Sequence, residues 1–291
     1  MGSTAAATGG YYVPHGSKWP IIGSISLFTM MFGAANWMNE KPIGKPLFFI
    51  GMTAILCMLF GWFRDVIGES IAGRFKSQED MSFRMGMLWF IFSEVMFFAA
   101  FFGALFYARH FSLPWLGGEG DGFSTNQLLY NGYVANWPNN GPGNIGGVFK
   151  TIGPWGLPLL NTLILLTSGT TITLAHWALK VGERFWLSFW MAATVLLGML
   201  FLYFQATEYI HAYHALNLTL GSGVYGSTFF MLTGFHGLHV TLGTLMLAII
   251  MFRCMSGHFT KDNHFGFEAV AWYWHFVDVV WLGLFVFVYV L

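Results

Sequence analysis

Charged residues are scarce in this sequence. They make up only 9% of its 291 residues, while hydrophobic residues make up 56%; a soluble domain usually has about 25% charged residues. The scarcity excludes an ordinary water-soluble domain and indicates a membrane protein. Thirteen basic residues balance thirteen acidic ones, and no local basic patch is present, so no nucleic-acid partner is expected.

Cysteine and internal repetition are also lacking. The two cysteines, Cys57 and Cys254, lie inside or at the end of apolar segments, where a free thiol behaves as a small hydrophobic group. No disulfide and no CxxC motif is therefore expected. The absence of an internal repeat counts against transporter folds built from duplicated halves.

Long apolar segments, by contrast, are abundant. A hydrocarbon layer about 30 Å thick is crossed by roughly 20 mostly apolar residues in a helix, and seven segments reach this length. Each must satisfy its own backbone hydrogen bonds in lipid and is too long for a barrel strand, so all are predicted to be α-helices. The predicted fold is an all-α membrane protein with spans near 19–38, 46–67, 82–110, 157–180, 185–209, 223–253 and 266–290.

Basic residues are distributed unevenly between the connections of these spans. With the N-terminus inside, nine of the thirteen Lys and Arg residues fall on the inner side, as the positive-inside rule requires. We therefore expect the N-terminus inside and the C-terminus outside. The predicted organisation is an N-terminal inside segment 1–18, a two-helix unit 19–67, an inside linker 68–81 and a five-helix bundle 82–291. Its long loop at 111–156 is rich in Gly and Asn and is expected to be irregular and outside the bilayer.

Ionisable side chains inside the spans are the first candidates for function, because they are costly in lipid and normally face the bundle interior. The simpler interpretation of each is a satisfied polar contact that fixes helix packing. The candidates are Glu94, His176, His236, His239, His275 and Asp278, with Glu208, His211 and His214 at an outer end.

Glu94, in the apolar stretch IFSEVMFFAAFF, needs a partner at its own depth. At about 1.5 Å per residue, Glu94 lies roughly 18 Å from the inner start of its span, and His239 lies roughly 21 Å from the inner end of its span near Arg253. His236 lies one turn further out, and Asp278 would add like-charge repulsion unless one carboxyl stayed protonated. We therefore predict a hydrogen bond between Glu94 and His239. Two interpretations stay open: a contact that only locks two helices together, or a carboxyl that stays protonated or shares a proton.

Two histidine pairs have the i,i+3 spacing that places both imidazoles on one helix face, as metal sites require. They are His236/His239 in GFHGLHV and His211/His214 in IHAYH. A di-iron site would need further histidine and carboxylate ligands from several helices, and a bis-histidine haem would need opposed histidines at matching depths. The sequence therefore predicts no metal or haem site in this chain.

Two C-terminal segments of the chain read GVYGSTFFMLTGFHGLHVTLGTLMLAIIMFR and HFGFEAVAWYWHFVDVVWLGLFVFVY. Together they closely resemble subunit III of cytochrome c oxidase. The resemblance continues in FSEVMFF, LPLLNTLILLTSGTTITLAHWAL, QATEY and GWFRDVIGE, so it covers nearly the whole chain from Trp19 onward. The loop 111–156 is longer than is expected for the family.

The resemblance implies that the first two helices and the last five enclose a V-shaped cleft filled with phospholipid. It also implies that haem and copper are bound by the partner subunits I and II, which reduce oxygen and pump protons. This chain is then a non-redox subunit of an aa3-type cytochrome c oxidase, a proton-translocating oxidoreductase. It would bind subunit I directly, support proton uptake and protect the complex during turnover, with no cofactor or catalytic residue of its own. The implied location is the bacterial inner (cytoplasmic) membrane, which the chain crosses several times.

Arg253 and Arg64, at the inner ends of the sixth and second spans, are candidate phospholipid ligands, with Trp62 beside Arg64. A guanidinium binds a phosphate through paired hydrogen bonds, and both residues are expected at the headgroup level next to the implied cleft.

Two other functions stay open. A self-contained proton or solute transporter would need a chain of polar groups across the bilayer, and the intramembrane groups are too sparse to line one. A membrane oxidoreductase with its own haem or metal would be recognised by the absorption spectrum of the isolated chain.

Overall fold

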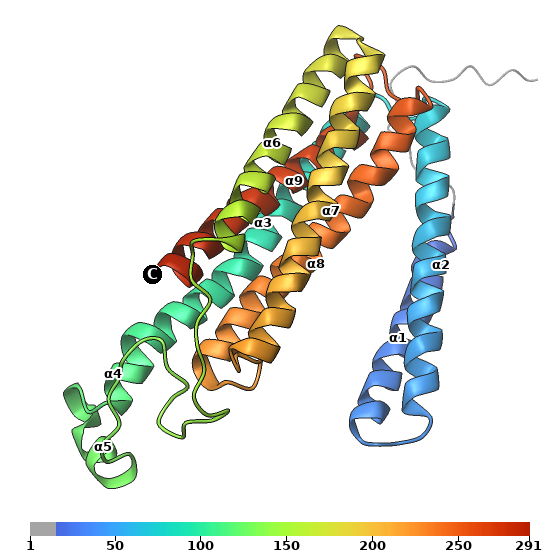
Figure 1. The fold of residues 1–291 in the computed structure, drawn as a ribbon. Coiled ribbons are helices and arrows are strands. Elements are labelled where there is room, and N and C mark those ends of the chain that lie inside the picture. Colours follow the sequence, from blue (N-terminus) through green and yellow to red (C-terminus); the bar gives the residue numbers. More distant parts are fainter. Residues whose placement is uncertain (1–15) are drawn as a thin grey trace, which may run out of the picture. The chain divides into compact units, whose positions relative to one another are not determined.

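The computed structural model describes residues 16–291, and within them every regular element is a helix (Figure 1). Seven helical segments are long and apolar enough to cross a membrane, which confirms the predicted all-α fold and the seven spans. Residues 1–15 of the predicted N-terminal segment lie outside the described residues. The long helices are α1 (Trp19–Met38), α2 (Gly44–Ile71), α3 (Ser77–Tyr107), α6 (Leu157–Val181), α7 (Arg184–Ala215), α8 (Gly223–Met255) and α9 (Phe265–Leu284).

Local sequence explains several helix ends. Pro20 and Pro158 lie in the first turns of α1 and α6, where the missing backbone N–H costs nothing. Glu79 and Asp80 lie in the first turn of α3, where a negative charge favours the helix N-terminus. Gly182 ends α6 with a φ of 92°, a left-handed conformation that a residue with a Cβ rarely adopts.

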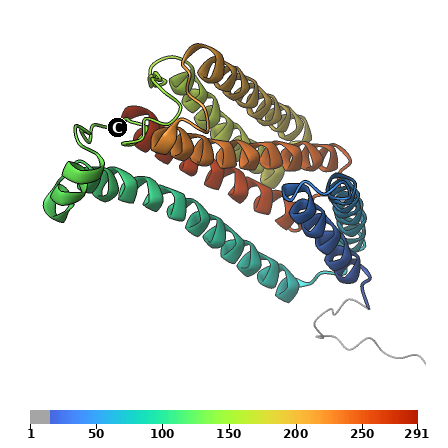
Figure 2. The same ribbon diagram turned by 90° about the horizontal axis from the view of Figure 1, so that it is seen from below.

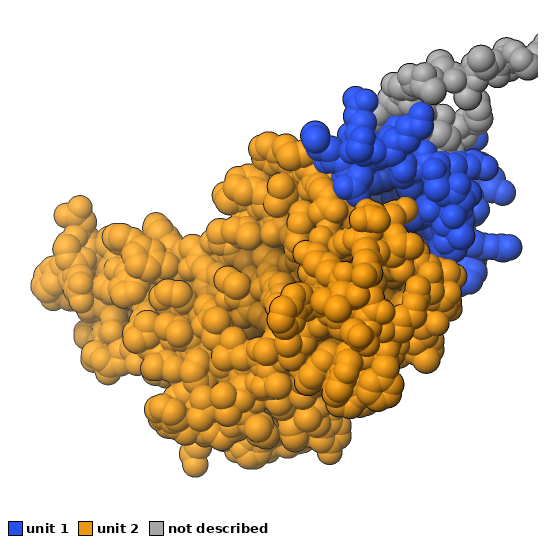
Figure 3. Space-filling view, turned by 90° about the horizontal axis from the view of Figure 1, so that it is seen from above, with its two compact units in different colours: residues 1–83 blue, residues 84–291 orange. Residues whose placement is uncertain are grey.

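The chain forms two compact units, residues 1–83 and 84–291, and the boundary falls inside α3 (Figure 3). In the first unit α1 and α2 pack against each other as a hairpin. Gly33 of α1 faces the backbone of Phe48, and Gly51 of α2 faces the backbone of Met30, with no room for a Cβ at either glycine. Small residues at a helix contact let two backbones approach closely in lipid. The glycines therefore account for the tight hairpin.

In the second unit α6, α7, α8 and α9 form a closed bundle, in which α6 packs on α7, α7 on α8, α8 on α9 and α9 on α6. Trp274 and Trp281 of α9 are fully buried, and each donates an indole N–H to α6, to Ser168 Oγ and Thr162 Oγ1 respectively, both at 2.9 Å. A buried indole N–H needs such an acceptor. These two bonds fix how α9 is rotated against α6.

The part of α3 that belongs to this unit lies along one side of the bundle and faces α8 and α9 (Figure 2). Its contacts are aromatic: the Phe97 ring is 5.1 Å from the Phe235 ring of α8, and the Phe98 ring is 6.1 Å from the Phe276 ring of α9. This packing places the middle of α3 beside α8, where Glu94 faces His239.

Two sequence expectations about connections differ from the structure. α2 continues to Ile71 and α3 begins at Ser77, so most of the predicted linker 68–81 is helical. The prediction placed the end of each span at the first charged residues after an apolar run. A helix can continue beyond that point, because Glu, Lys and Arg are good helix formers. The expectation of an irregular loop at 111–156 is wrong in part, because α4 (Leu113–Leu116) and α5 (Phe123–Leu129) lie within it.

Candidate functional site

The structure brings Glu94 and His239 together. Glu94 Oε2 lies 2.9 Å from His239 Nε2, and the two side chains are 22% and 11% exposed. The contact joins the middle of α3 to the middle of α8. At this distance the two atoms share a hydrogen bond, and Glu94 therefore has a direct partner inside the second unit.

The other ring nitrogen of His239 determines how many protons the pair holds. His239 Nδ1 lies 2.7 Å from the carbonyl oxygen of Phe235, one turn earlier in α8. A carbonyl can only accept, so Nδ1 bears a hydrogen. Nε2 then either donates as part of an imidazolium to a Glu94 carboxylate or accepts from a protonated Glu94 carboxyl. In both states the pair is neutral and one proton lies between Nε2 and Oε2.

Aromatic side chains surround this pair. The rings of Phe98 and Tyr273 have centroids 5.0 and 6.3 Å from the His239 imidazole, and the Phe97 ring is 5.9 Å away. An apolar shell lowers the local dielectric, which strengthens a satisfied hydrogen bond and makes an unpaired charge costly. The shell therefore makes the contact between Glu94 and His239 important for the packing of α3 on α8.

Three of the remaining intramembrane candidates, His236, His275 and Asp278, lie against neighbouring helices. His236 Nε2 lies 3.3 Å from the carbonyl oxygen of Val277 on α9, and His275 Nε2 lies 3.4 Å from Thr173 Oγ1. The Asp278 carboxylate is buried against Gly169 of α6, where a Cβ on the glycine would touch it. These contacts join neighbouring helices of the bundle, while His236 Nδ1 and Asp278 Oδ1 have no hydrogen-bond partner among the described residues.

Glu208 has a partner that the sequence did not reveal. The Tyr289 hydroxyl donates to Glu208 Oε1 at 2.6 Å, and both residues are buried. His211 and His214, further along α7, are exposed. A tyrosine near the end of a membrane helix is ordinarily part of an interfacial aromatic belt, so its position gave no sign of this contact.

The candidate lipid ligands lie in different units and are described separately. Arg253, in the last turn of α8, places its guanidinium 4.4 Å from the centre of the Phe259 ring. Arg64 and Trp62 lie on α2 of the first unit, where the Trp62 ring stacks on Phe63 with centroids 5.6 Å apart. The Arg253 guanidinium thus lies over an aromatic ring, and Arg64 follows a stacked aromatic pair in the sequence of α2.

Comparison with known proteins identifies the family. Residues 10–121 and 134–291 match the family described as "Cytochrome c oxidase subunit III". The chain belongs to this family. Proteins named "Cytochrome c oxidase subunit 3" are similar to it over nearly their whole length. The one from Prototheca wickerhamii is 41% identical over 274 residues, covering 94% of each chain. That from Marchantia polymorpha is 42% identical, covering 94% of this chain and 93% of the relative, and that from Danio rerio is 41% identical, covering 96% of each.

The interruption in the match to cytochrome c oxidase subunit III, residues 122–133, contains α5. This short helix is held by Asn126, whose side-chain amide donates to the carbonyl oxygen of Leu116 at 2.8 Å. Close by, burial raises the pKa of the Tyr133 hydroxyl, an effect partly offset by its hydrogen bond to Asn139. The segment that departs from the subunit III pattern is therefore an ordered addition within the long loop.

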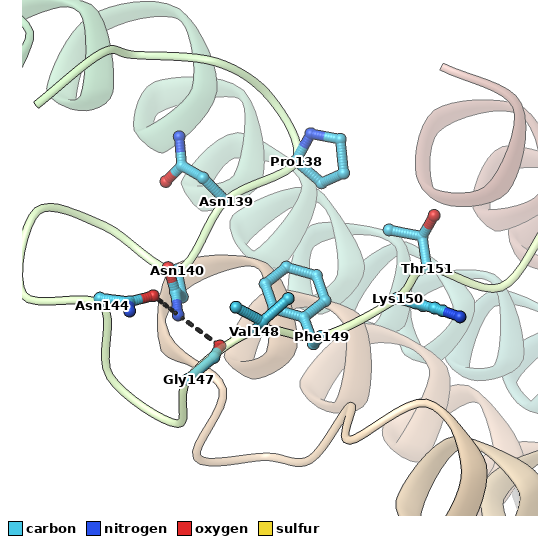
Figure 4. Close-up of a pocket in the computed structure, with 9 residues that line it drawn as sticks. All are labelled: Pro138, Asn139, Asn140, Asn144, Gly147, Val148, Phe149, Lys150 and Thr151. Carbon is cyan, nitrogen blue, oxygen red and sulfur yellow. Dashed lines mark hydrogen bonds between the residues drawn. The ribbon is translucent and has the colours of Figure 1, made fainter.

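The rest of the loop, which matches subunit III, folds against the connection between α7 and α8. The Asn217 side chain donates to the carbonyl oxygens of Gly146 and Val148, both at 3.0 Å. Asn140 borders a shallow pocket and donates to Asn144 Oδ1 at 2.8 Å and to the Gly147 carbonyl at 2.9 Å (Figure 4). Asparagine amides here replace the backbone bonds of regular structure, which explains how a Gly-rich loop holds one conformation.

Proposed function

We propose that this chain is the non-redox third subunit of an aa3-type cytochrome c oxidase, a proton-translocating oxidoreductase. The observation that supports the proposal is the family match over almost the whole chain, together with relatives whose names state the same subunit. Haem and copper belong to partner subunits I and II, and this chain binds subunit I directly. It supports proton uptake and prolongs the activity of the oxygen-reducing core.

The contacts of the intramembrane histidines support a non-redox role. A haem ligand needs a free imidazole nitrogen that faces the iron. Both nitrogens of His239 are occupied, by Glu94 and by the Phe235 carbonyl, and His236 Nε2 faces the Val277 carbonyl. These side chains are engaged in packing the helices of the chain itself, so we assign the redox centres to partner subunits.

The proposal also includes an orientation and a location. We infer that the chain crosses the bacterial cytoplasmic membrane seven times with its N-terminus inside, because nine of its thirteen basic residues then face the cytoplasm. Thiol labelling of single cysteines introduced at Ser17 and Leu291, in an otherwise cysteine-free chain, tests the orientation. Labels must reach the two positions from opposite sides of the membrane; labelling of both from one side contradicts the proposal.

We further propose that Arg253, and in the first unit Arg64 with Trp62, bind phospholipid headgroups. Each arginine is on a long apolar helix, and a guanidinium binds phosphate by paired hydrogen bonds. Native mass spectrometry of the complex tests this by counting bound lipids. Arg253→Ala should reduce tightly bound phospholipid, whereas Arg109→Ala, a basic residue on the opposite side in the inferred topology, should not. An undiminished lipid count in Arg253→Ala contradicts the assignment.

Co-purification and reconstitution test the function itself. Tagged chain extracted in mild detergent should bring haem-containing subunits with it. The core of subunits I and II without this chain should reduce oxygen at first but lose activity and proton uptake sooner during turnover. Adding the purified chain back should restore both. Lasting, fully proton-coupled activity of the core alone would contradict the proposed role.

A further inference from the structure

Three side chains that commonly bind metals converge at one end of the second unit, apart from the Glu94–His239 pair. They are His176 near the end of α6, His264 directly before α9 and Glu268 in the first turn of α9. Their ligand atoms all lie within 4.8 Å of one another. The fold thus brings together potential metal ligands from the end of α6 and from the start of α9.

The distances within this set match those of a tetrahedral metal site. Glu268 Oε1 lies 3.4 Å from His176 Nε2 and 3.3 Å from His264 Nε2. Around a zinc ion with ligand bonds of about 2.0–2.1 Å, neighbouring ligand atoms of a tetrahedron lie about 3.3–3.4 Å apart. Two edges of such a tetrahedron are therefore already present.

Two imidazole nitrogens of this set, His176 Nε2 and His264 Nε2, have no hydrogen-bond partner among the described residues. The set is also buried, since His264 and Glu268 are only 8% and 9% exposed. Buried polar atoms are nearly always bonded in native proteins. A cation placed between the three side chains would satisfy both nitrogens and the carboxylate oxygen together.

The surroundings orient both His264 and Glu268. His264 Nδ1 lies 3.1 Å from the carbonyl oxygen of Thr260, so Nδ1 bears a hydrogen and, in a neutral ring, Nε2 presents its lone pair to Glu268. On the other side, the Arg84 guanidinium forms an ion pair with Glu268 Oε2, which leaves Oε1 directed at the imidazoles. A carbonyl behind a histidine and a charged partner behind a carboxylate are the usual supports of metal ligands.

We propose that His176, His264 and Glu268 form a binding site for a divalent transition-metal ion of the zinc class, with water as the fourth ligand. Two imidazoles and one carboxylate suit zinc, whereas magnesium and calcium prefer oxygen ligands. The bound ion would link α6 to the start of α9 and act as a structural or regulatory ion without redox chemistry. This differs from the sequence expectation of no metal site, and it does not depend on the proposed oxidase function.

Zinc titration of the full chain in detergent, after treatment with a chelator, tests the proposal. Calorimetry should find one saturable site, and zinc X-ray absorption should show two imidazole ligands among nitrogen and oxygen ligands at about 2.0–2.1 Å. His264→Asn and Glu268→Gln should each weaken binding by roughly 100-fold, because each removes one of three protein ligands. The matched control is the double variant His211→Asn and His214→Asn, an exposed pair, which should bind zinc unchanged.

One further variant separates ligand loss from general damage. Arg84→Gln keeps a hydrogen-bond donor near Glu268 but removes the ion pair that directs Glu268 Oε1 at the imidazoles, so zinc should bind about tenfold more weakly. This loss should be smaller than the loss in His264→Asn and Glu268→Gln, whereas general damage to the fold would weaken binding alike in all three variants. Zinc binding that is unaffected by His264→Asn and Glu268→Gln would overturn the proposal, as would the absence of any saturable binding. In the latter case the cluster is an imidazolium–carboxylate ion pair only.

Discussion

Glu94 Oε2 lies 2.9 Å from His239 Nε2, while His239 Nδ1 faces the carbonyl oxygen of Phe235 at 2.7 Å. The backbone carbonyl accepts a hydrogen bond from Nδ1, so a hydrogen bond between Nε2 and Oε2 requires one further proton in the Glu94–His239 contact. A deprotonated pair would set a carboxylate against an imidazole lone pair inside an aromatic shell. The structural and the proton-holding interpretations of Glu94 therefore describe the same contact, and they differ in what replacement of the carboxyl does.

Replacing Glu94 distinguishes these interpretations. Glu94→Gln retains a donor that can reach His239 Nε2, so assembly and thermal stability should stay close to those of the unchanged protein. Glu94→Leu leaves the imidazole nitrogen without a partner and should lower the free energy of unfolding by about 1–3 kcal/mol. Thermal denaturation of the detergent-solubilised complex measures both effects.

Infrared difference spectra and proton-coupled activity show whether the proton of the Glu94–His239 pair is exchanged during turnover. If the pair only packs helices, Glu94→Gln keeps full proton-coupled activity. If the pair exchanges its proton during turnover, a carboxyl or carboxylate band assigned to Glu94 changes during turnover and vanishes in the Gln variant, together with part of the proton uptake. Glu119→Gln, in the exposed loop, is the control and should leave both signals unchanged.

Much of this fold follows from the sequence because membrane thickness is a strong constraint. Seven apolar runs predict seven helices, and a fixed rise per residue relates the depths of Glu94 and His239 on separate helices. Depth does not determine helix rotation, however. Which face of α9 meets α6 depends on the two indole bonds from Trp274 and Trp281, and no periodicity in an almost uniformly apolar helix indicates these.

Span ends were harder to predict than span centres. His264 and Glu268 lie at the start of α9, where helices extend past the hydrocarbon and depth no longer limits the choice of partner. Their contact with His176, which lies 88 and 92 residues earlier in the chain respectively, depends on the path of the 256–264 connection. Likewise, the bond between Tyr289 and Glu208 depends on how the last turns of the chain fold back on α7.

Removing the Tyr289 hydroxyl should lower the stability of the protein, because the buried Glu208 carboxyl loses a hydrogen-bond donor. Tyr289→Phe keeps the ring but deprives Glu208 Oε1 of its donor at 2.6 Å. The stability of the complex should fall by about 1–3 kcal/mol, because a buried acceptor loses its partner. Tyr203→Phe, on an exposed face of α7, should change stability little. Equal melting temperatures for the Tyr289 variant and the unchanged protein would contradict a buried bond.

The indole of Trp274 should be needed for both packing and hydrogen bonding. Trp274→Phe removes the N–H bond to Ser168 and leaves part of a fully buried site unfilled. We expect a loss of about 2–4 kcal/mol, from the cavity and from the lost indole hydrogen bond. Denaturation with a graded detergent or urea series measures it. Trp177→Phe, whose ring is 70% exposed, provides the comparison and should be nearly neutral.

The α1–α2 hairpin should depend on Gly51. A Cβ at this position would meet the backbone and Cβ of Met30, and a backbone cannot yield as a flexible side chain does. Gly51→Val should therefore force α1 away from α2, at a cost of about 1–3 kcal/mol or more from overpacking. The matched control is Gly68→Ala, on the same helix, where a Cβ would meet open space. This variant should be neutral or slightly stabilising, because alanine stabilises a helix by about 1 kcal/mol relative to glycine. The separation of the two helices is reported by trapping cysteines introduced at Gly23 and Met58 with a short thiol cross-linker, in a chain without Cys57 and Cys254. The end of the Met58 side chain reaches Gly23 across the hairpin. Trapping should be efficient in Gly68→Ala and poor in Gly51→Val; efficient trapping in Gly51→Val would show that the hairpin tolerates a side chain there and that close backbone approach does not hold it together.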